Sequence, residues 1–342
     1  MGFEYINQMP SPAETKQQFQ MSGSLRRAKQ ANDEAVKAVL SGEDSRFLVI
    51  IGPCSADRED AVLDYMVRLA GVNEKVRDKL MIVPRVYTSK PRTTGSGYKG
   101  LLHQPNPHTL SDLYRGILAM RRMHMRVAEE TGMTTADEML YPELYEYTSD
   151  LLSYVAVGAR SVENQQHRLT ASGMDIGAGL KNPTSGELSV MMNAILAAQN
   201  SHHFIFRGWE VVSGGNPYAH AILRGYTDSR GHSAPNYHYE DLQKLCELYA
   251  AGDYRNPAVV IDANHANSGK RFDEQPRIVK EVLDSRRDSA DIAGIVKGVM
   301  VESYLLDGCQ RASGNTYGLS ITDPCLGWEK TERLLYDMAE EL

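Results

Sequence analysis

From Phe47 onward the chain alternates between short apolar runs and longer stretches in which apolar residues recur at helical spacing. The first run spans 47–55 and is rich in branched residues, and the stretch after it places Ala61, Tyr65 and Leu69 on one face. This alternation predicts strands separated by helices. Further apolar runs lie at 80–87, 134–139, 154–161, 176–182, 202–208, 219–225, 257–265 and 294–303.

Continuous apolar strands between helices are typical of a parallel sheet that is covered on both faces. The run at 202–208 and the valines after it are interpreted as an inserted β-hairpin, at about 202–220, which leaves eight strands. Eight alternating units in roughly 300 residues predict an α/β fold, a closed (β/α)8 TIM barrel over 47–342 with the hairpin before its sixth strand. The polar segment 1–46, with one predicted helix at about 24–40, is interpreted as an N-terminal extension.

Composition and charge narrow the class of protein. The 342 residues include 37 Lys and Arg against 44 Asp and Glu, a net charge of −7, which argues against nucleic acid as a partner. No apolar run approaches the roughly 18–20 residues that cross a bilayer, and the first twenty residues lack the order of a signal peptide. We therefore expect a cytoplasmic protein without membrane contacts. Four scattered cysteines predict neither a disulfide scaffold nor a zinc finger.

Four of the predicted strands end in a cation. Arg85, Arg160, Lys181 and Arg224 follow strands two, four, five and six, and Glu138 ends strand three. Because the C-terminal ends of barrel strands meet on one rim, these cations are expected to converge there. Like charges at one site repel unless an anion neutralises them, so the pattern predicts a ligand with more than one anionic group, such as a phosphate and a carboxylate.

Strands one, seven and eight are neighbours in a closed barrel, and they end in Cys54, His265 and Glu302. Asp323, just after the last strand, is expected to join them. A thiol, an imidazole and two carboxylates form a mixed donor set that favours one divalent ion such as Mn²⁺, Fe²⁺, Co²⁺ or Zn²⁺. The remaining cysteines lack such company and are interpreted as structural residues; they are Cys246, Cys309 and Cys325.

The Gly- and Pro-rich segment 90–107 follows the second strand. Its GSGYKG sequence at 95–100 matches the spacing of a dinucleotide-binding fingerprint, but Pro105 and Pro107 prevent the helix that such a fingerprint requires. Lys90, Arg92 and Thr93 are better suited to bind a second phosphate at the barrel mouth.

Nine short motifs follow one another along the chain. They are IGPCS (51–55), RVYTSKPRTT (85–94), GARS (158–161), QQHR (165–168), LKNPTSG (180–186), ILRG (222–225), DANHANSGK (262–270), GVMVES (298–303) and SITDPCLGWE (320–329). Together they resemble the motifs of 3-deoxy-D-arabino-heptulosonate 7-phosphate (DAHP) synthase, in the branch of the bacterial feedback-regulated enzymes. The resemblance begins at about residue 24 and covers nearly the whole chain. It implies a metal-dependent condensation of phosphoenolpyruvate with erythrose 4-phosphate, which opens the shikimate pathway.

The resemblance also implies a role for each matching residue. The metal ligands would be Cys54, His265, Glu302 and Asp323, and the catalytic residues Lys90, His265 and Glu138. Lys90 would protonate the developing alkoxide, and Glu138 would manage the attacking water. Phosphoenolpyruvate would be bound by Arg85, Lys90, Ala159, Arg160, Lys181 and Arg224, and the aldose phosphate by Arg92 and Thr93.

Relatives of this kind bind an aromatic amino acid beside the hairpin and form homodimers or homotetramers, so both properties are expected here. The segment 140–148 and the hairpin differ from known effector patterns, which leaves the effector open. Three alternative functions also remain open at this point. They are condensation of phosphoenolpyruvate with another aldose phosphate, a Schiff-base aldolase that uses Lys181 or Lys297, and a non-catalytic barrel that senses a metabolite.

Overall fold

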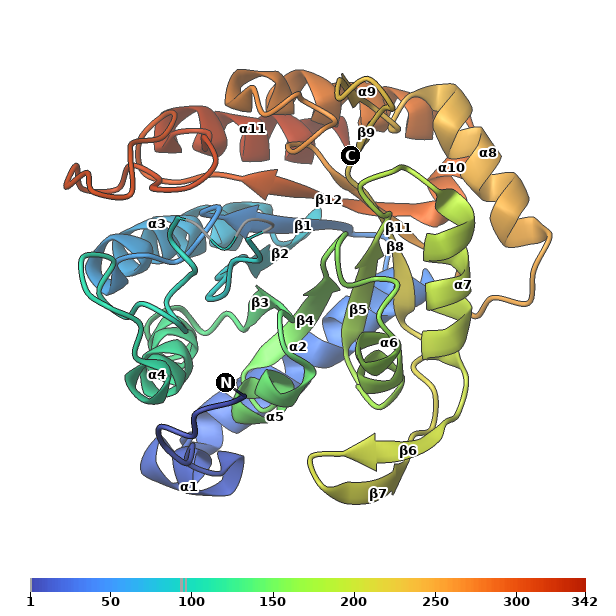
Figure 1. Ribbon diagram of the computed structural model, residues 1–342. Helices are drawn as coiled ribbons and strands as arrows, with labels where there is room; N and C mark the ends of the chain where they lie inside the picture. The colour runs from blue at the N-terminus through green and yellow to red at the C-terminus, as the bar shows by residue number, and fades with distance from the viewer. Residues whose placement is uncertain (1, 93–94, 96) are drawn as a thin grey trace.

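The computed structural model describes residues 2–92, 95 and 97–342. Eight parallel strands follow one another around a barrel in chain order (Figure 1). The two ends of the sheet, β2 and β3, meet through a parallel bridge between Arg85 and Ala136. The predicted (β/α)8 barrel is therefore confirmed. Its strands are β1 (Phe47–Gly52), β2 (Leu80–Pro84), β3 (Thr135–Glu138), β4 (Leu152–Val157), β5 (Gly177–Lys181), β8 (Ala219–Leu223), β11 (Val259–Asp262) and β12 (Val296–Glu302).

The strands read as continuous apolar runs because both of their faces are buried. In β1, Leu48 and Ile50 pack with the side chains inside the barrel, whereas Val49 and Ile51 pack in the cluster that the surrounding helices cover. Successive side chains of a strand point to opposite faces, so alternating polar residues would bury polar side chains in the apolar core on one of the two faces.

Helices separate the strands and cover the barrel. In α4, Ile117, Met120 and Val127 form the buried face that the spacing predicts, and Asp112 accepts a hydrogen bond from the Arg115 amide at its N-terminus. The helices are α1 (Pro12–Gln18), α2 (Gly23–Ser41), α3 (Glu59–Val76), α4 (Leu113–Thr131), α5 (Tyr145–Thr148), α6 (Gln165–Ser172), α7 (Leu188–Gln199), α8 (Tyr239–Ala250), α9 (Gln275–Asp288), α10 (Ala290–Ile295) and α11 (Trp328–Glu341), with 3-10 turns η1 (Pro142–Leu144) and η2 (Phe272–Glu274). No helix in the described ranges is long and apolar enough to cross a membrane.

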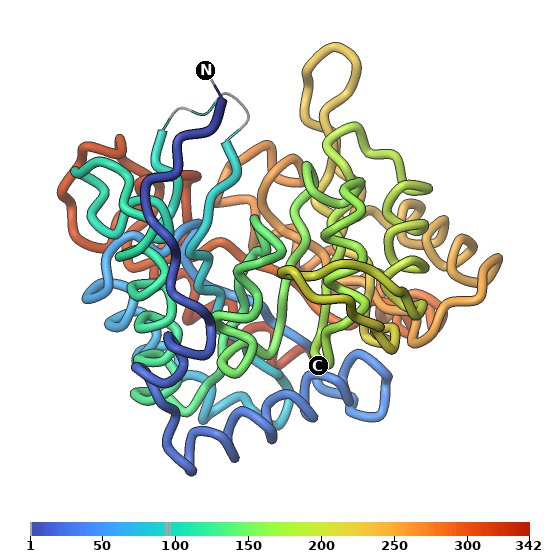
Figure 2. The backbone as a smooth tube through the Cα atoms, turned by 60° about the horizontal axis from the view of Figure 1, so that its bottom comes forward, coloured from blue at the N-terminus to red at the C-terminus, as the bar shows by residue number. Residues whose placement is uncertain are grey.

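The segment before β1 covers the N-terminal end of the barrel. Val36 and Leu40 of α2 pack into the inner cluster, and a Cβ added at Gly177 would lie 3.0 Å from Leu40 Cδ1. The N-terminal residues run alongside α4 (Figure 2), where Met9 packs and the Tyr147 hydroxyl donates to the Pro10 carbonyl. The division into an extension at 1–46 and a barrel at 47–342 stays a prediction.

The predicted hairpin is present between α7 and β8. Its strands β6 (His203–Phe206) and β7 (Trp209–Val212) pair antiparallel and project away from the barrel (Figure 1). Because it follows a helix and precedes a strand, the hairpin belongs to the N-terminal end of the barrel. A second small ribbon, β9 (Tyr226–Thr227) with β10 (Ser233–Ala234), follows β8 at the opposite end.

Candidate active site

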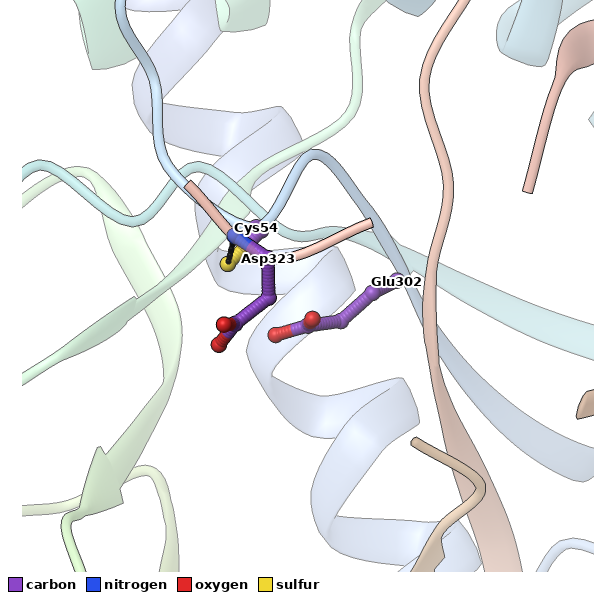
Figure 3. Close-up of side chains that lie close together, drawn as sticks. All are labelled: Cys54, Glu302 and Asp323. Atoms are coloured by element: carbon purple, nitrogen blue, oxygen red, sulfur yellow. Dashed lines mark hydrogen bonds between the residues drawn. The ribbon is translucent and has the colours of Figure 1, made fainter. Parts of the chain in front are cut away.

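Three predicted metal ligands come together at the C-terminal ends of β1 and β12. One ligand atom each of Cys54, Glu302 and Asp323 lies within 4.8 Å of the others. Figure 3 shows the two carboxyl groups side by side, with the Cys54 sulfur next to the Asp323 backbone. That sulfur accepts a hydrogen bond from the Asp323 amide at 3.3 Å. The adjacency of the first and last barrel strands brings together residues that are far apart in the sequence.

The charges of this cluster favour a cation. Burial, followed by the charge of Glu302, raises the pKa of Cys54 to about 11. Burial also acts to raise the pKa values of Glu302 and Asp323, but Arg85 beside Glu302 and Lys90 near Asp323 bring both below their usual range. Two ionised carboxylates beside a thiol that ionises on binding are a donor set for a divalent metal ion.

His265, the fourth predicted ligand, stands beside this cluster. Its Nε2 lies 3.9 Å from Glu302 Oε1, and its Nδ1 lies 2.8 Å from Asp262 Oδ2. The residue adopts a left-handed backbone conformation, with a φ of 47°, in the turn after β11. Such a φ is strained for a residue with a Cβ and is often found where function fixes a side chain.

Two of the predicted cations are buried near the centre of the barrel mouth. Arg85 forms an ion pair with Glu302 at 2.8 Å, and its guanidinium carbon lies 3.7 Å from the centre of the Tyr87 ring. Lys181 Nζ lies 3.5 Å from Glu138 Oε1 and 3.6 Å from Asp262 Oδ2. Buried charges are stable only when partners neutralise them, and each of these cations has at least one carboxylate in reach.

The protonation states of the central groups follow from this arrangement. Burial raises the pKa of Glu138, but Lys181, Lys90 and Arg85 outweigh it and bring the pKa below its usual value. Burial lowers the pKa of Lys90, but Cys54, whose Sγ is 2.8 Å from Nζ, and Glu302 raise it overall. At neutral pH, Glu138 is therefore an anion that can accept a proton, and Lys90 is a cation that can donate one.

The remaining predicted residues lie around the rim. Arg224 is half-buried, and burial together with the charge of Arg160 lowers its pKa. Arg160 itself is exposed and follows the half-buried Ala159. Arg92 Nε donates to the Tyr98 carbonyl at 2.8 Å, and Thr93 lies outside the described residues. The four predicted cations therefore follow strands whose C-terminal ends meet at one end of the barrel.

One alternative lysine is placed far from this chemistry. Lys297 is near the start of β12, where a Cβ added at Gly42 would lie 3.2 Å from its Nζ. It therefore belongs to the N-terminal end of the barrel, opposite the cluster. The structure thus contradicts Lys297 as the lysine of a Schiff-base aldolase that shares the predicted site.

Sequence patterns missed several contacts at the site. Cys325 is fully buried in the core, in agreement with its interpretation as a structural residue, but its contact with the cluster was not predicted: the Cys54 amide donates to Cys325 Sγ at 3.4 Å. Asp262, the last residue of β11, contacts both Lys181 and His265. A charged residue at the end of a buried strand was the sequence signal that could have identified it as part of the site. Asn264, which donates to Glu302 Oε2 at 2.6 Å, had no comparable signal.

The chain is similar to known enzymes over almost its whole length. Residues 16–336 match the DAHP synthetase I family. A phospho-2-dehydro-3-deoxyheptonate aldolase of Haemophilus influenzae is 39% identical over 324 residues, 91% of this chain and 85% of that protein. The Trp-sensitive phospho-2-dehydro-3-deoxyheptonate aldolase of Escherichia coli is 34% identical over 342 residues, 98% of this chain and 95% of that protein.

A solved structure agrees with these sequence matches. The phospho-2-dehydro-3-deoxyheptonate aldolase from Francisella tularensis SCHU S4 superposes with a TM-score of 0.92 and 28% identity, covering 99% of this chain and 98% of that chain. The barrel, the cluster at its mouth and these similarities agree with one another. The chain belongs to the DAHP synthetase I family.

Proposed function

We propose that this chain condenses phosphoenolpyruvate with erythrose 4-phosphate and water to give DAHP and phosphate. This condensation is the family's reaction and the first step of the shikimate pathway. The observation that best supports it is the joint placement, at one barrel end, of the Cys54, Glu302 and Asp323 cluster and the buried cations Arg85 and Lys181. A divalent metal ion and two phosphorylated substrates are ligands that suit such a set.

We assign one divalent metal ion to Cys54, Glu302 and Asp323, with His265 as the fourth ligand. The mixed donor set favours Mn²⁺, Fe²⁺, Co²⁺ or Zn²⁺. When bound, the ion acts as a Lewis acid that polarises the aldehyde of the sugar phosphate. The Cys54 thiol loses its proton on binding, and Lys90, whose Nζ lies 2.8 Å from Sγ, stabilises the thiolate that results.

The cations bind the substrates. Arg85 and Lys181 are buried at the barrel mouth and suit the phosphate and carboxylate of phosphoenolpyruvate, because charged nitrogen donors form strong hydrogen bonds with such groups. The rim residues complete the two binding sites. For phosphoenolpyruvate these are Lys90, the backbone of Ala159, Arg160 and Arg224, and for the aldose phosphate they are Arg92 and Thr93.

Lys90 and Glu138 move the protons of the reaction. The C3 carbon of phosphoenolpyruvate bonds to the aldehyde carbon, and Lys90 protonates the alkoxide that forms. Water then adds to the electron-poor C2 carbon and gives its proton to Glu138, which its cationic neighbours keep ionised. The bond between C2 and the phosphate oxygen then breaks as the new C2 hydroxyl gives its proton to the departing phosphate, which leaves the ketone of DAHP. His265 would help to hold the metal ion, and Asp262, whose Oδ2 lies 2.8 Å from His265 Nδ1, orients the imidazole ring for that role.

Phosphate release from phosphoenolpyruvate with a panel of aldose phosphates tests this assignment. We expect release with erythrose 4-phosphate and a loss of roughly 100-fold or more in kcat for Glu138→Gln, the scale of general acid–base catalysis. The half-buried Glu146→Gln, on α5, is the matched control. Full activity of Glu138→Gln would remove its role, and preference for another aldose phosphate would favour the alternative substrate.

We propose that an aromatic amino acid regulates the enzyme at a pocket beneath the hairpin. The pocket has a volume of about 170 Å³ and is bordered by Phe204, Phe206, Tyr145 and Thr170. An apolar cavity of about 150 Å³ accommodates benzene, so this volume suits an aromatic side chain. The E. coli relative named above is Trp-sensitive. We expect Trp, Phe or Tyr to inhibit the enzyme. Phe206→Ala should weaken this inhibition, whereas the control Ile205→Ala should preserve it.

We also propose that the enzyme forms a homodimer or homotetramer. Trp209 and Ile205 on the hairpin are 75% and 72% exposed, and Phe3 in the N-terminal segment is 96% exposed. Large apolar side chains gathered on projecting segments are typical of protein interfaces. Sedimentation analysis should give a dimer or tetramer that Trp209→Ser weakens. A cytoplasmic location remains a prediction from the sequence.

A further inference from the structure

A buried carboxylate next to Glu138 has no role in the mechanism above. Asp137 and Glu138 are successive residues of β3, so their side chains point to opposite faces of the strand. Glu138 faces Lys181 in the barrel mouth, whereas Asp137 faces α4, where it meets His124. Asp137 is 6% exposed. A buried carboxylate of this kind is stable only when hydrogen-bond donors surround it.

Asp137 accepts four hydrogen bonds from two segments of the site and from α4. Its Oδ1 accepts from the amides of Thr88 at 2.9 Å and Glu138 at 2.7 Å. Its Oδ2 accepts from the Thr88 hydroxyl at 2.5 Å and from His124 Nε2 at 3.1 Å. One side chain thus connects the loop after β2, the end of β3 and helix α4.

His124 holds the Asp137 carboxylate in place from helix α4. Its side chain is fully buried, and its Nδ1 lies 2.8 Å from the Thr135 hydroxyl. Because a carboxylate only accepts, the ring donates from Nε2 to Asp137, and in the neutral ring Nδ1 accepts from Thr135. Both ring nitrogens are therefore engaged, which fixes the orientation of the ring and of the carboxylate.

These bonds cross the seam of the barrel. Among the described residues, β2 and β3 are joined by a single parallel bridge, between Arg85 and Ala136. Thr88 follows that bridge and lies two residues before Lys90. The Asp137 contacts therefore fasten the segment that bears Lys90 to the strand that bears Glu138, at the place where the sheet itself provides little pairing.

We propose that Asp137, oriented by His124, is a positioning residue that sets the placement of Lys90 relative to Glu138. The inference rests on the roles proposed above for those two residues. A displacement of about 1 Å between reacting groups can reduce a rate about 100-fold. Asp137 acts by holding Thr88 and the Glu138 amide, and it does not touch the substrates.

Steady-state kinetics of Asp137→Ala, Asp137→Asn and Thr88→Val test the proposal, with manganese binding measured by calorimetry. We expect Asp137→Ala to lower kcat roughly 10- to 100-fold, on the scale of such displacements, with manganese affinity unchanged. Asp137→Asn retains an oxygen for the two amides and should recover most of kcat. Thr88→Val, which loses the hydroxyl contact alone, should fall between them.

Asp150→Ala is the matched control, because it removes a 2.7 Å ion pair to Arg121 on the same helix without touching either site segment. Unchanged kcat in Asp137→Ala would overturn the proposal, as would an equal kcat loss in Asp150→Ala at a similar melting temperature. If Asp137→Ala does not fold, Thr88→Val and His124→Gln decide in the same way. If the unaltered protein shows no turnover, both the proposed function and this inference are wrong. If the unaltered protein and Asp137→Ala are equally active, only this inference is wrong.

Discussion

At the scale of single residues, the site is a set of buried charges that neutralise one another. Arg85 pairs with Glu302, and Lys181 lies between Glu138 and Asp262. Removing one member of a buried ion pair leaves the other charge without a partner, which costs about 3–5 kcal/mol of stability. A substitution at these positions therefore changes folding as well as substrate binding, so a melting temperature has to accompany each kinetic comparison.

His220, inside the barrel, makes the stability of the fold depend on pH. Its Nδ1 lies 2.8 Å from the Tyr218 carbonyl and its Nε2 lies 2.8 Å from the Tyr154 hydroxyl. Burial lowers the pKa of His220 to about 4. Between about pH 6.5 and pH 4 the unfolded chain binds a proton that the folded protein does not, so stability is lost as the pH falls through this window.

We expect that loss to reach about 3 kcal/mol, at about 1.4 kcal/mol for each pH unit of the window. Denaturant unfolding of the unaltered protein and of His220→Gln, at pH 7 and pH 4.5, measures it. The two proteins should differ in their pH dependence. Parallel stability curves over this range would show that His220 is protonated equally in the folded and unfolded states.

At the scale of elements, close packing inside the barrel restricts which residues a strand accepts. A Cβ added at Gly179 of β5 would lie 2.1 Å from the Tyr154 hydroxyl oxygen and 2.4 Å from Ile222 Cδ1. Gly179→Ala should therefore destabilise the fold by about 1–3 kcal/mol, the scale of overpacking. Gly71→Ala in α3 is the control, since nothing lies within 4 Å there, and it should stabilise by about 0.5–1 kcal/mol. Thermal unfolding distinguishes the two, and an unaffected Gly179→Ala would contradict the packing.

The sequence predicted elements better than contacts between them. The barrel strands were visible because both faces of each are apolar, and the residues at their ends followed from the parallel arrangement. Contacts between distant elements left no periodic signal. His124 has the spacing of any residue on the buried face of α4, and its bond to Asp137 depends on how that helix packs on β3. Cys325 likewise meets Cys54 only because a loop after β12 folds back over β1.

At the scale of the whole molecule, the barrel separates two ends with different tasks. The proposed metal ligands and the cations proposed to bind the substrates lie at the C-terminal ends of the strands. Helix α2, the hairpin and the pocket beneath it belong to the N-terminal end. The N-terminal segment and the hairpin therefore lie opposite the proposed site, where an effector or a second subunit can bind without blocking substrates.

The most direct test of the proposed metal-dependent condensation is phosphate release from phosphoenolpyruvate, measured with and without erythrose 4-phosphate, a chelator and added Mn²⁺. We expect phosphate release that requires the aldose phosphate, stops with the chelator and returns with Mn²⁺. Cys54→Ser should lose metal affinity and most of this activity, whereas the exposed Cys309→Ser should retain both. Undiminished turnover in the presence of the chelator, or a Cys54→Ser enzyme that binds metal and turns over normally, would contradict the proposed metal-dependent mechanism.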